Sequence, residues 1–260
     1  MIIVSYFGNL YLDHFKKDCK EIKAHGFDTI LFCITENDIR WNKENIKAMK
    51  EYAESQNFNT LAGPWGLAGV FGGEAVSSIS YERDGLRKVI QLFDDWIRTV
   101  IDIGFKTVFF DEPHAGNKTL EFVKKIFNKY ESMIDFYVCF CDAKFESLKD
   151  EDIQQLPMKN VGLSAYFWTI DDEKIKRVLT NWITRLIKLR PIDNHIWIQG
   201  FDLPEGREHV PSMVYNIAWD LGIRNFGFWG FKSAEATSAK RAVNYKMVWK
   251  QTSRLFNRVA

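Results

Sequence analysis

Hydrophobic and polar positions along the chain follow two alternating periods. Eight short runs rich in apolar, β-branched and aromatic residues predict strands, and the longer segments between them repeat apolar residues every three to four positions. The clearest helical face carries Val89, Phe93, Trp96 and Val100. The predicted strands are residues 2–7, 29–34, 60–65, 107–110, 136–141, 161–167, 195–201 and 225–231, and the predicted helices are residues 13–25, 42–57, 82–103, 120–133, 143–155, 171–189, 207–221 and 238–258.

Three of the predicted helices end in a glycine shortly before the next strand, at Gly26, Gly104 and Gly222. Glycine adopts the left-handed conformation of a helix C-terminus at little cost, and the repeated junction indicates repeated βα units. Eight strands alternating with eight helices in 260 residues predict an α/β fold, a single (β/α)8 TIM barrel forming one domain over residues 1–260. A long glycine-rich loop, residues 63–81, follows the third strand.

Composition and charge narrow the class of protein. A hydrophobic fraction of 46% is sufficient for a large core, and 35 Lys and Arg against 34 Asp and Glu leave a formal charge of +1. This balance favours neither a nucleic acid nor an anionic membrane as partner. The start of the chain lacks the features of a signal peptide, and no run approaches the roughly 20 apolar residues of a membrane span. We therefore expect a cytoplasmic protein with four structural cysteines and no cofactor or metal. The sequence does not indicate an oligomeric state.

The segment from Thr107 to His114, Thr-Val-Phe-Phe-Asp-Glu-Pro-His, is the most informative in the chain. An apolar strand runs directly into Asp111 and Glu112, and Pro113 ends the strand because it cannot donate to a sheet ladder. Substrates of barrel enzymes bind at the carboxyl ends of the strands, where these acids and His114 fall. Because Glu112 alternates with Phe110 and Val108, we expect Glu112 to point into the barrel and Asp111 to have the opposite direction.

The other strand ends are rich in acids and aromatic residues and poor in basic ones. The candidates for substrate contact are Tyr6, Glu36, Trp65, Glu74, His114, Asp142, Tyr166, Gln199 and Trp229, with Glu205 in the loop after the seventh strand. The seventh and eighth strand ends are bulky, unlike a phosphate cradle, and no strand has an internal lysine for a Schiff base. The pattern favours carboxylate chemistry on an uncharged polar substrate, of which glycoside hydrolysis is the standard example.

The Glu112-Pro113 pair at the end of the fourth strand resembles the Asn-Glu-Pro motif of the large clan of retaining (β/α)8 glycosidases. Across most of its length the chain is also similar to a set of uncharacterised bacterial and archaeal glycosidase-like barrels, through Pro-Trp-Gly…Phe-Gly-Gly-Glu, Phe-Asp-Glu-Pro-His and Gln-Gly-Phe…Gly-Arg-Glu. The clan resemblance implies that Glu112 is the general acid/base, with a nucleophile after strand seven and an aromatic residue at strand eight. Asp111 stands where the clan has its asparagine, and Gln199 closes strand seven where the clan has a glutamate.

The sequence therefore predicts a glycoside hydrolase for a small oligosaccharide or glycoside. Glu112 is the expected acid, and Glu205 is the first candidate for the second carboxylate, ahead of Asp111 and Glu74. Two alternatives remain open at this stage. Glu36, Glu112, His114 and Asp142 could gather a divalent metal, as in sugar isomerases that resemble the xylose isomerase type. The barrel could instead bind a carbohydrate or a partner protein without catalysis.

Overall fold

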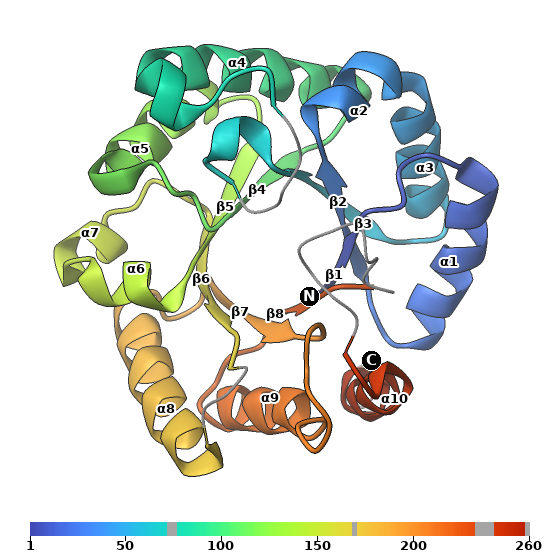
Figure 1. The fold of residues 1–260 in the computed structure, drawn as a ribbon, viewed down its shortest axis with the longest axis vertical. Helices are drawn as coiled ribbons and strands as arrows, with labels where there is room; N and C mark the ends of the chain where they lie inside the picture. The colour runs from blue at the N-terminus through green and yellow to red at the C-terminus, as the bar shows by residue number, and fades with distance from the viewer. Residues whose placement is uncertain (72–76, 168–170, 232–241, 258–260) are drawn as a thin grey trace.

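Eight parallel strands close into a barrel in the order β1 to β8 in the computed structural model, which describes residues 1–71, 77–167, 171–231 and 242–257. Strand β1 pairs with both β2 and β8, so the sheet has no free edge. The strands are β1 (Ile2–Tyr6), β2 (Thr29–Ile34), β3 (Asn59–Pro64), β4 (Thr107–Asp111), β5 (Asp135–Phe140), β6 (Asn160–Ala165), β7 (Asn194–Gln199) and β8 (Phe226–Trp229). The predicted (β/α)8 TIM barrel is confirmed (Figure 1).

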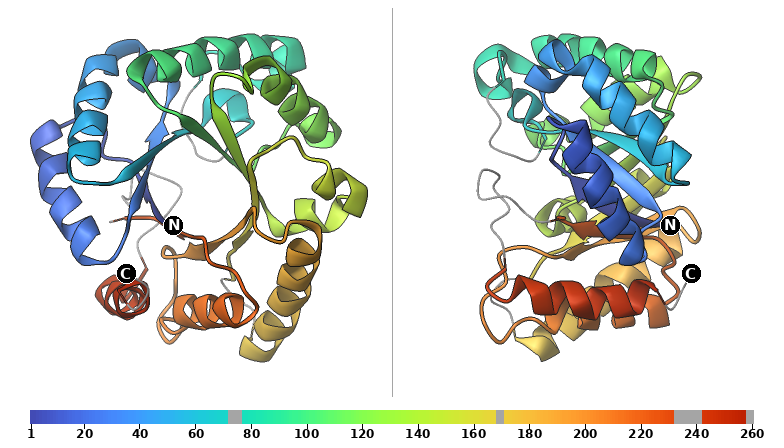
Figure 2. Two further views of the ribbon diagram at one scale, coloured as in Figure 1. Left: turned by 180° about the vertical axis from the view of Figure 1, so that it is seen from behind. Right: turned by 90° about the vertical axis from the view of Figure 1, so that its right-hand side faces the viewer.

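Helices surround the strands on the outside (Figures 1 and 2). They are α1 (Leu12–Ala24), α2 (Glu36–Trp41), α3 (Lys43–Ser55), α4 (Tyr81–Ile103), α5 (Thr119–Tyr130), α6 (Asp142–Ser147), α7 (Asp150–Gln154), α8 (Asp172–Leu189), α9 (Val210–Asp220) and α10 (Tyr245–Phe256), with short 3-10 turns at Leu67–Gly69 and Gly116–Lys118. Within the described ranges, no helix combines the length and the apolar character that a membrane crossing requires.

The main differences between the helices and the sequence prediction lie in three places. Helix α2 was not predicted, and it begins with a capping box in which Thr35 and Asp38 bond each other's backbone N–H groups. The predicted helix 143–155 is two helices, because Leu148 is extended between them. The last helix begins at Tyr245, and residues 238–241 of its predicted start lie outside the described residues.

The glycines predicted to end helices adopt the left-handed conformation. Gly26, Gly104 and Gly222 have φ angles of 88°, 100° and 106°. After Gly104 the N–H of Phe105 donates to the carbonyl of Val100 at 3.0 Å, which satisfies a carbonyl at the helix end. These junctions turn the chain from a helix back into the barrel, as the sequence predicts.

The barrel interior is a packed core in which glycines make room for large side chains. Trp197 and His195 on β7 point inward and are fully buried. A Cβ on Gly227 of β8 would lie 2.3 Å from the Trp197 ring, and a Cβ on Gly162 of β6 would lie 2.4 Å from the His195 ring. Since neither ring can share its space with another side chain, the two glycines on the neighbouring strands fix where the two rings sit.

Candidate active site at the carboxyl end of the fourth strand

Strand β4 directs Asp111, not Glu112, along the inward face of the barrel. Phe109 belongs to the interior cluster with Trp197 and Trp229, whereas Val108 and Phe110 pack in the layer between strands and helices. Asp111 shares the direction of Phe109, so the predicted direction of Asp111 is wrong. The error arises because a parallel strand is apolar on both faces, and Val108-Phe109-Phe110 shows no alternation.

Glu112 nevertheless reaches the site, because its backbone leaves the strand conformation. Its φ angle is 42°, in the left-handed region that residues with a side chain rarely adopt. Its N–H still donates to the carbonyl of Cys139 on β5 at 2.9 Å, which holds the turn against the next strand. Such a backbone conformation costs on the order of 1–3 kcal/mol and is characteristic of functional sites.

Asp111 is an acid in an apolar environment. Its charge acts on two buried thiols, Cys33 of β2 and Cys139 of β5. Burial raises the pKa of each thiol, and the Asp111 charge raises it further. The residue is 8% exposed. Burial, and then the neighbouring Glu112 carboxylate, hold the pKa of Asp111 well above its ordinary value. The environment therefore favours the protonated, neutral form of Asp111.

Glu112 is the more accessible acid, with 21% of its side chain exposed. Burial raises its pKa, and this effect outweighs the opposing influence of a hydrogen bond from Ser164 and of the nearby His114. The His114 Nε2 atom lies 3.9 Å from the Glu112 Oε2 atom. The exposed Asp142 carboxylate at the start of α6 also raises the pKa of Glu112. A partly exposed acid with a raised pKa is suited to donating a proton.

Ser164 on β6 is a site residue that lies at a predicted strand end but was not among the candidates for substrate contact. It is buried, its Oγ atom lies 3.3 Å from the Cys139 Sγ atom, and it bonds the side chains of both Glu112 and Tyr166. A serine hydroxyl has one proton, so it can donate to only one of these partners. The arrangement that satisfies all three groups has Tyr166 donating to Ser164 and Ser164 donating to Glu112. Serine is common at strand ends, so no signal in one sequence marks it.

The two tryptophans predicted at the site pack on each other at the end of the barrel interior. The ring centroids of Trp65 and Trp229 are 5.2 Å apart, and Phe7 contacts both rings at 4.9 and 5.4 Å. Both tryptophans are buried, and Trp229 also meets Trp197 edge to face. They form the apolar floor near Tyr166 and Cys139. In this conformation little of either indole is open to solvent.

Two predicted candidates are engaged in structural contacts away from the acid pair. Tyr6 packs against Phe15 in the layer beneath α1 and donates a hydrogen bond to Asp18 at 2.9 Å. Glu36 is buried and accepts hydrogen bonds from Ser77 and Ser78 at 2.6 to 2.8 Å, with Arg40 at 2.9 Å. These contacts attach the loop after β3 to the start of α2.

Gln199 and Glu205 also differ from their expected surroundings. The Gln199 amide accepts from the N–H of Phe167 at 2.8 Å and donates to the carbonyl of Phe201 at 3.0 Å, so it joins the β6 and β7 loops. Glu205 is exposed in the turn before α9, and no hydrogen bond or ion pair joins it to another described residue. Glu208, by contrast, is buried, and its carboxylate accepts a hydrogen bond from the N–H of Gly206 at 3.1 Å. Glu74 lies outside the described residues.

The four residues considered for a metal site do not form one ligand set. Across the described ranges, no three or more His, Cys, Asp or Glu side chains are grouped so that they could share a metal ion. Glu36 accepts hydrogen bonds from Ser77, Ser78 and Arg40. Of the other three residues, His114 and Asp142 are near Glu112, but they do not form a ligand group with it. The residues that do converge are Asp111, Glu112, Ser164 and Tyr166.

Comparison with known proteins supports the fold. No model of a protein family matches the chain, and no curated protein sequence matches it. Among solved structures, concanavalin B aligns with 99% of this chain and 96% of its own at 10% identity and a TM-score of 0.56. A type I 3-dehydroquinate dehydratase from Clostridium difficile aligns over 100% and 93% at 17% identity and a TM-score of 0.57. A truncated 3-deoxy-D-arabino-heptulosonate 7-phosphate synthase from Thermotoga maritima aligns over 99% and 86% at 9% identity and a TM-score of 0.58.

These similarities define the class of fold and nothing narrower. The chain is similar to TIM barrels of several kinds. Sequence identities of 9 to 17% support a shared fold, but they do not support a shared reaction. The function must therefore be argued from the residues at the carboxyl end of β4.

Proposed function

We propose that the protein is a glycoside hydrolase that acts on a small oligosaccharide or glycoside at the carboxyl end of its barrel. The observation that carries the proposal is the adjacent acid pair, in which Glu112 is partly exposed, Asp111 is buried, and both have raised pKa values. General acids of glycosidases depend on such environments, because a carboxyl group must hold its proton near neutral pH before donating it.

Glu112 would donate its proton to the glycosidic oxygen as the bond from that oxygen to the anomeric carbon breaks. Charge then moves from the sugar oxygen to the Glu112 carboxylate, and the hydrogen bond from Ser164 stabilises that carboxylate. Burial, and to a smaller extent the charge of Asp142, raise the pKa of Glu112 and so favour its protonated form before the reaction. Asp111 takes no direct part in this scheme, because its burial keeps it from the substrate.

The second carboxylate needs access to water or to the sugar. Asp142 is exposed, and its charge acts on Glu112, so it is the described acid best placed for this role. Glu205 and Glu74 remain the predictions from sequence, and the contacts of Glu205 add no support to its role. A carboxyl separation of about 5–5.5 Å would accompany retention of configuration, and about 6.5–9.5 Å inversion.

The test is a hydrolysis screen over aryl glycosides and short oligosaccharides with the wild type and four variants. We expect Glu112→Gln to lose about two orders of magnitude or more in turnover, as for removal of a general acid. Asp142→Asn should also lose turnover, while Glu131→Gln, which changes an exposed glutamate after α5, should not. If Glu205→Gln lost turnover and Asp142→Asn did not, the sequence prediction would replace the assignment of Asp142.

The non-catalytic alternative gives a different result in the same experiment. A barrel that only binds carbohydrate would show no turnover on any substrate, and Glu112→Gln would retain the affinity of the wild type for the sugars it binds. That outcome would overturn the proposed activity, since an active enzyme loses turnover in the variant whatever happens to its affinity.

A further inference from the structure

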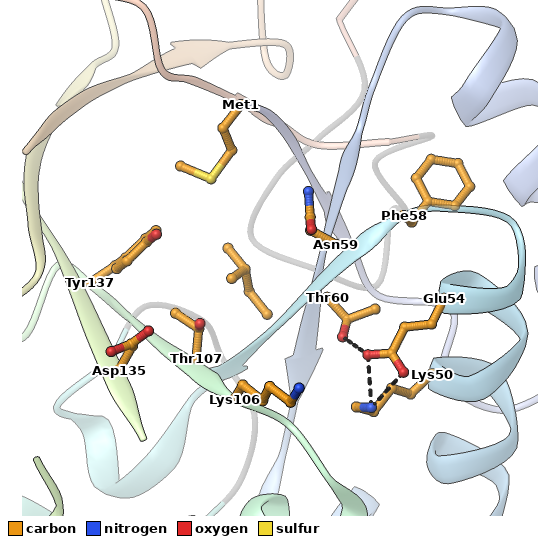
Figure 3. A pocket seen from close by; sticks show the side chains of 11 residues that line it. Met1, Lys50, Glu54, Phe58, Asn59, Thr60, Lys106, Thr107, Asp135 and Tyr137 are labelled. Atoms are coloured by element: carbon orange, nitrogen blue, oxygen red, sulfur yellow. Dashed lines mark hydrogen bonds and ion pairs between the residues drawn. The ribbon is translucent and has the colours of Figure 1, made fainter. Parts of the chain in front are cut away.

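A cavity of about 570 Å³ opens at the amino-terminal end of the barrel, opposite the acid pair (Figure 3). Asn59, Thr107 and Asp135, the first residues of β3, β4 and β5, lie on its wall. Asp111 is four residues further along β4 than Thr107, which separates the two ends by about 13 Å of strand. The full lining is Met1, Lys50, Glu54, Phe58, Asn59, Thr60, Leu61, Lys106, Thr107, Asp135 and Tyr137.

The two acids in the lining each have a cation of their own. Glu54 pairs with Lys50 at 2.8 Å and accepts a hydrogen bond from Thr60 at 2.9 Å. Asp135 pairs with Lys159 at 2.6 Å. Since both carboxylates are compensated, they offer little attraction to a cationic ligand and little repulsion to an anionic one.

Lys106 is a lysine of the cavity wall whose charge no described carboxylate compensates. No ion pair joins its ammonium group to any acid among the described residues. Figure 3 shows the ammonium ends of Lys106 and Lys50 on the same side of the cavity, below Asn59 and Thr60. Lys106 is exposed, whereas the Lys50 side chain is only 8% exposed and its ammonium pairs with Glu54.

The opposite part of the cavity is apolar. Leu61 belongs to the cluster of apolar side chains inside the barrel, and Met1 and Tyr137 pack against that cluster. Figure 3 shows the Met1 side chain above Tyr137. A volume of this size is within the range of small-molecule sites, which combine apolar walls with a few placed polar groups. Here the polar groups that are not bonded to Glu54 include the Lys106 ammonium and the Thr107 hydroxyl.

We propose that this cavity binds a small organic anion, with its negative head at Lys106 and its apolar body against Leu61 and Tyr137. The site is separate from the acid pair and does not depend on the proposed hydrolase activity. Its ligand class is a monocarboxylate with a ring or a branched chain, because the surplus charge of the wall is that of one lysine.

The experiment uses benzoate as the probe and the methyl resonances of Leu61 in the full-length protein as the readout. Acetate has the same head without the ring, and benzyl alcohol has the ring without the charge. We expect saturable shifts of the Leu61 methyl groups with benzoate, and affinities at least about fivefold weaker for acetate and for benzyl alcohol, since each lacks one of the two contacts.

The variant Lys106→Gln should weaken benzoate binding by about fivefold or more, a typical effect of one partly exposed charge pair. Lys149→Gln, at an exposed lysine between α6 and α7, is the matched control and should leave benzoate binding unchanged. The proposal is overturned if benzoate up to about 20 mM leaves the Leu61 resonances in place. Unchanged benzoate binding in Lys106→Gln would also overturn the proposal. So would benzyl alcohol, or acetate, binding as tightly as benzoate.

Discussion

Asp111 and Glu112 are neighbours in the chain, yet β4 directs Asp111 into the barrel and the left-handed turn at φ 42° places Glu112 at the rim. Their carboxyl groups interact strongly enough that Glu112 raises the pKa of Asp111. The fold thereby assigns two identical chemical groups to two environments, one enclosed and one accessible. Pairs of acids whose surroundings separate their properties are a general feature of acid catalysis.

The buried position of Asp111 has a cost in stability that depends on pH. Its folded-state pKa lies above that of the unfolded chain, so folding favours the protonated acid. This contribution to stability is complete below about pH 3.9 and is lost as pH rises toward the folded pKa. Asp111→Asn keeps the shape without the charge, and we expect it to be more stable than the wild type at pH 8.

Urea denaturation of wild type and Asp111→Asn at pH 5 and pH 8 measures this effect. The advantage of the variant should grow between the two pH values. Asp142→Asn is the control at an exposed acid and should leave the free energy of unfolding within about 0.5 kcal/mol of the wild type. An advantage of Asp111→Asn that is the same at both pH values would contradict a raised pKa for this group.

Ser164 should control the proton affinity of Glu112. Its hydrogen bond lowers the pKa of Glu112, so Ser164→Ala, which removes the donor, should raise that pKa. Because the proposed acid acts when protonated, the fall in kcat/KM at high pH should then move to higher pH.

Carbon-detected NMR titration of the Glu112 carboxyl measures the pKa directly. Ser164→Thr retains the hydroxyl and should restore the wild-type value, and a Thr variant that behaves like the Ala variant would refute the assignment.

The order of the strands follows from the sequence, whereas the contacts at the site depend on long-range packing. Alternating periods and the glycines at 26, 104 and 222 are local signals, and local signals were sufficient to predict eight βα units. No local signal shows which way the Asp111 side chain points, because the apolar run before it is compatible with either face of a buried strand pointing inward. The bonds from Glu36 to Ser77 and Ser78 join residues about forty positions apart, and the approach of Ser164 to Cys139 joins β5 and β6.

The pairing of large and small side chains inside the barrel predicts a sharp difference between two glycine substitutions. In Gly227→Ala the new Cβ would lie 2.3 Å from the Trp197 ring, which is enclosed and cannot withdraw. In Gly63→Ala it would lie 3.0 Å from the end of the flexible Leu31 side chain. Overpacking of a rigid core typically costs about 1–3 kcal/mol, so we expect a loss near the upper end for Gly227→Ala and less than about 1 kcal/mol for Gly63→Ala. Thermal or urea denaturation measures both, and equal losses would show that the Trp197 ring can move aside.

His195 should make the folded state sensitive to acid. Its ring is fully buried, its Nδ1 atom bonds Asn160, and burial lowers its pKa to about 3. The unfolded chain binds a proton at this position below about pH 6.5, so the stability contributed by the neutral imidazole is complete above that pH and declines as pH falls toward 3. Between pH 7 and pH 5 the loss from this one group should be about 2 kcal/mol. Asp111 and Glu112 act in the opposite direction, so the wild type alone does not isolate the effect. His195→Gln has no titrating group at this position and retains an amide that can bond Asn160. As the pH falls from 7 to 5, the unfolding free energy of the wild type should therefore decrease by about 2 kcal/mol relative to that of the variant. Parallel pH dependences for the two proteins would mean that the imidazole is protonated in the folded barrel.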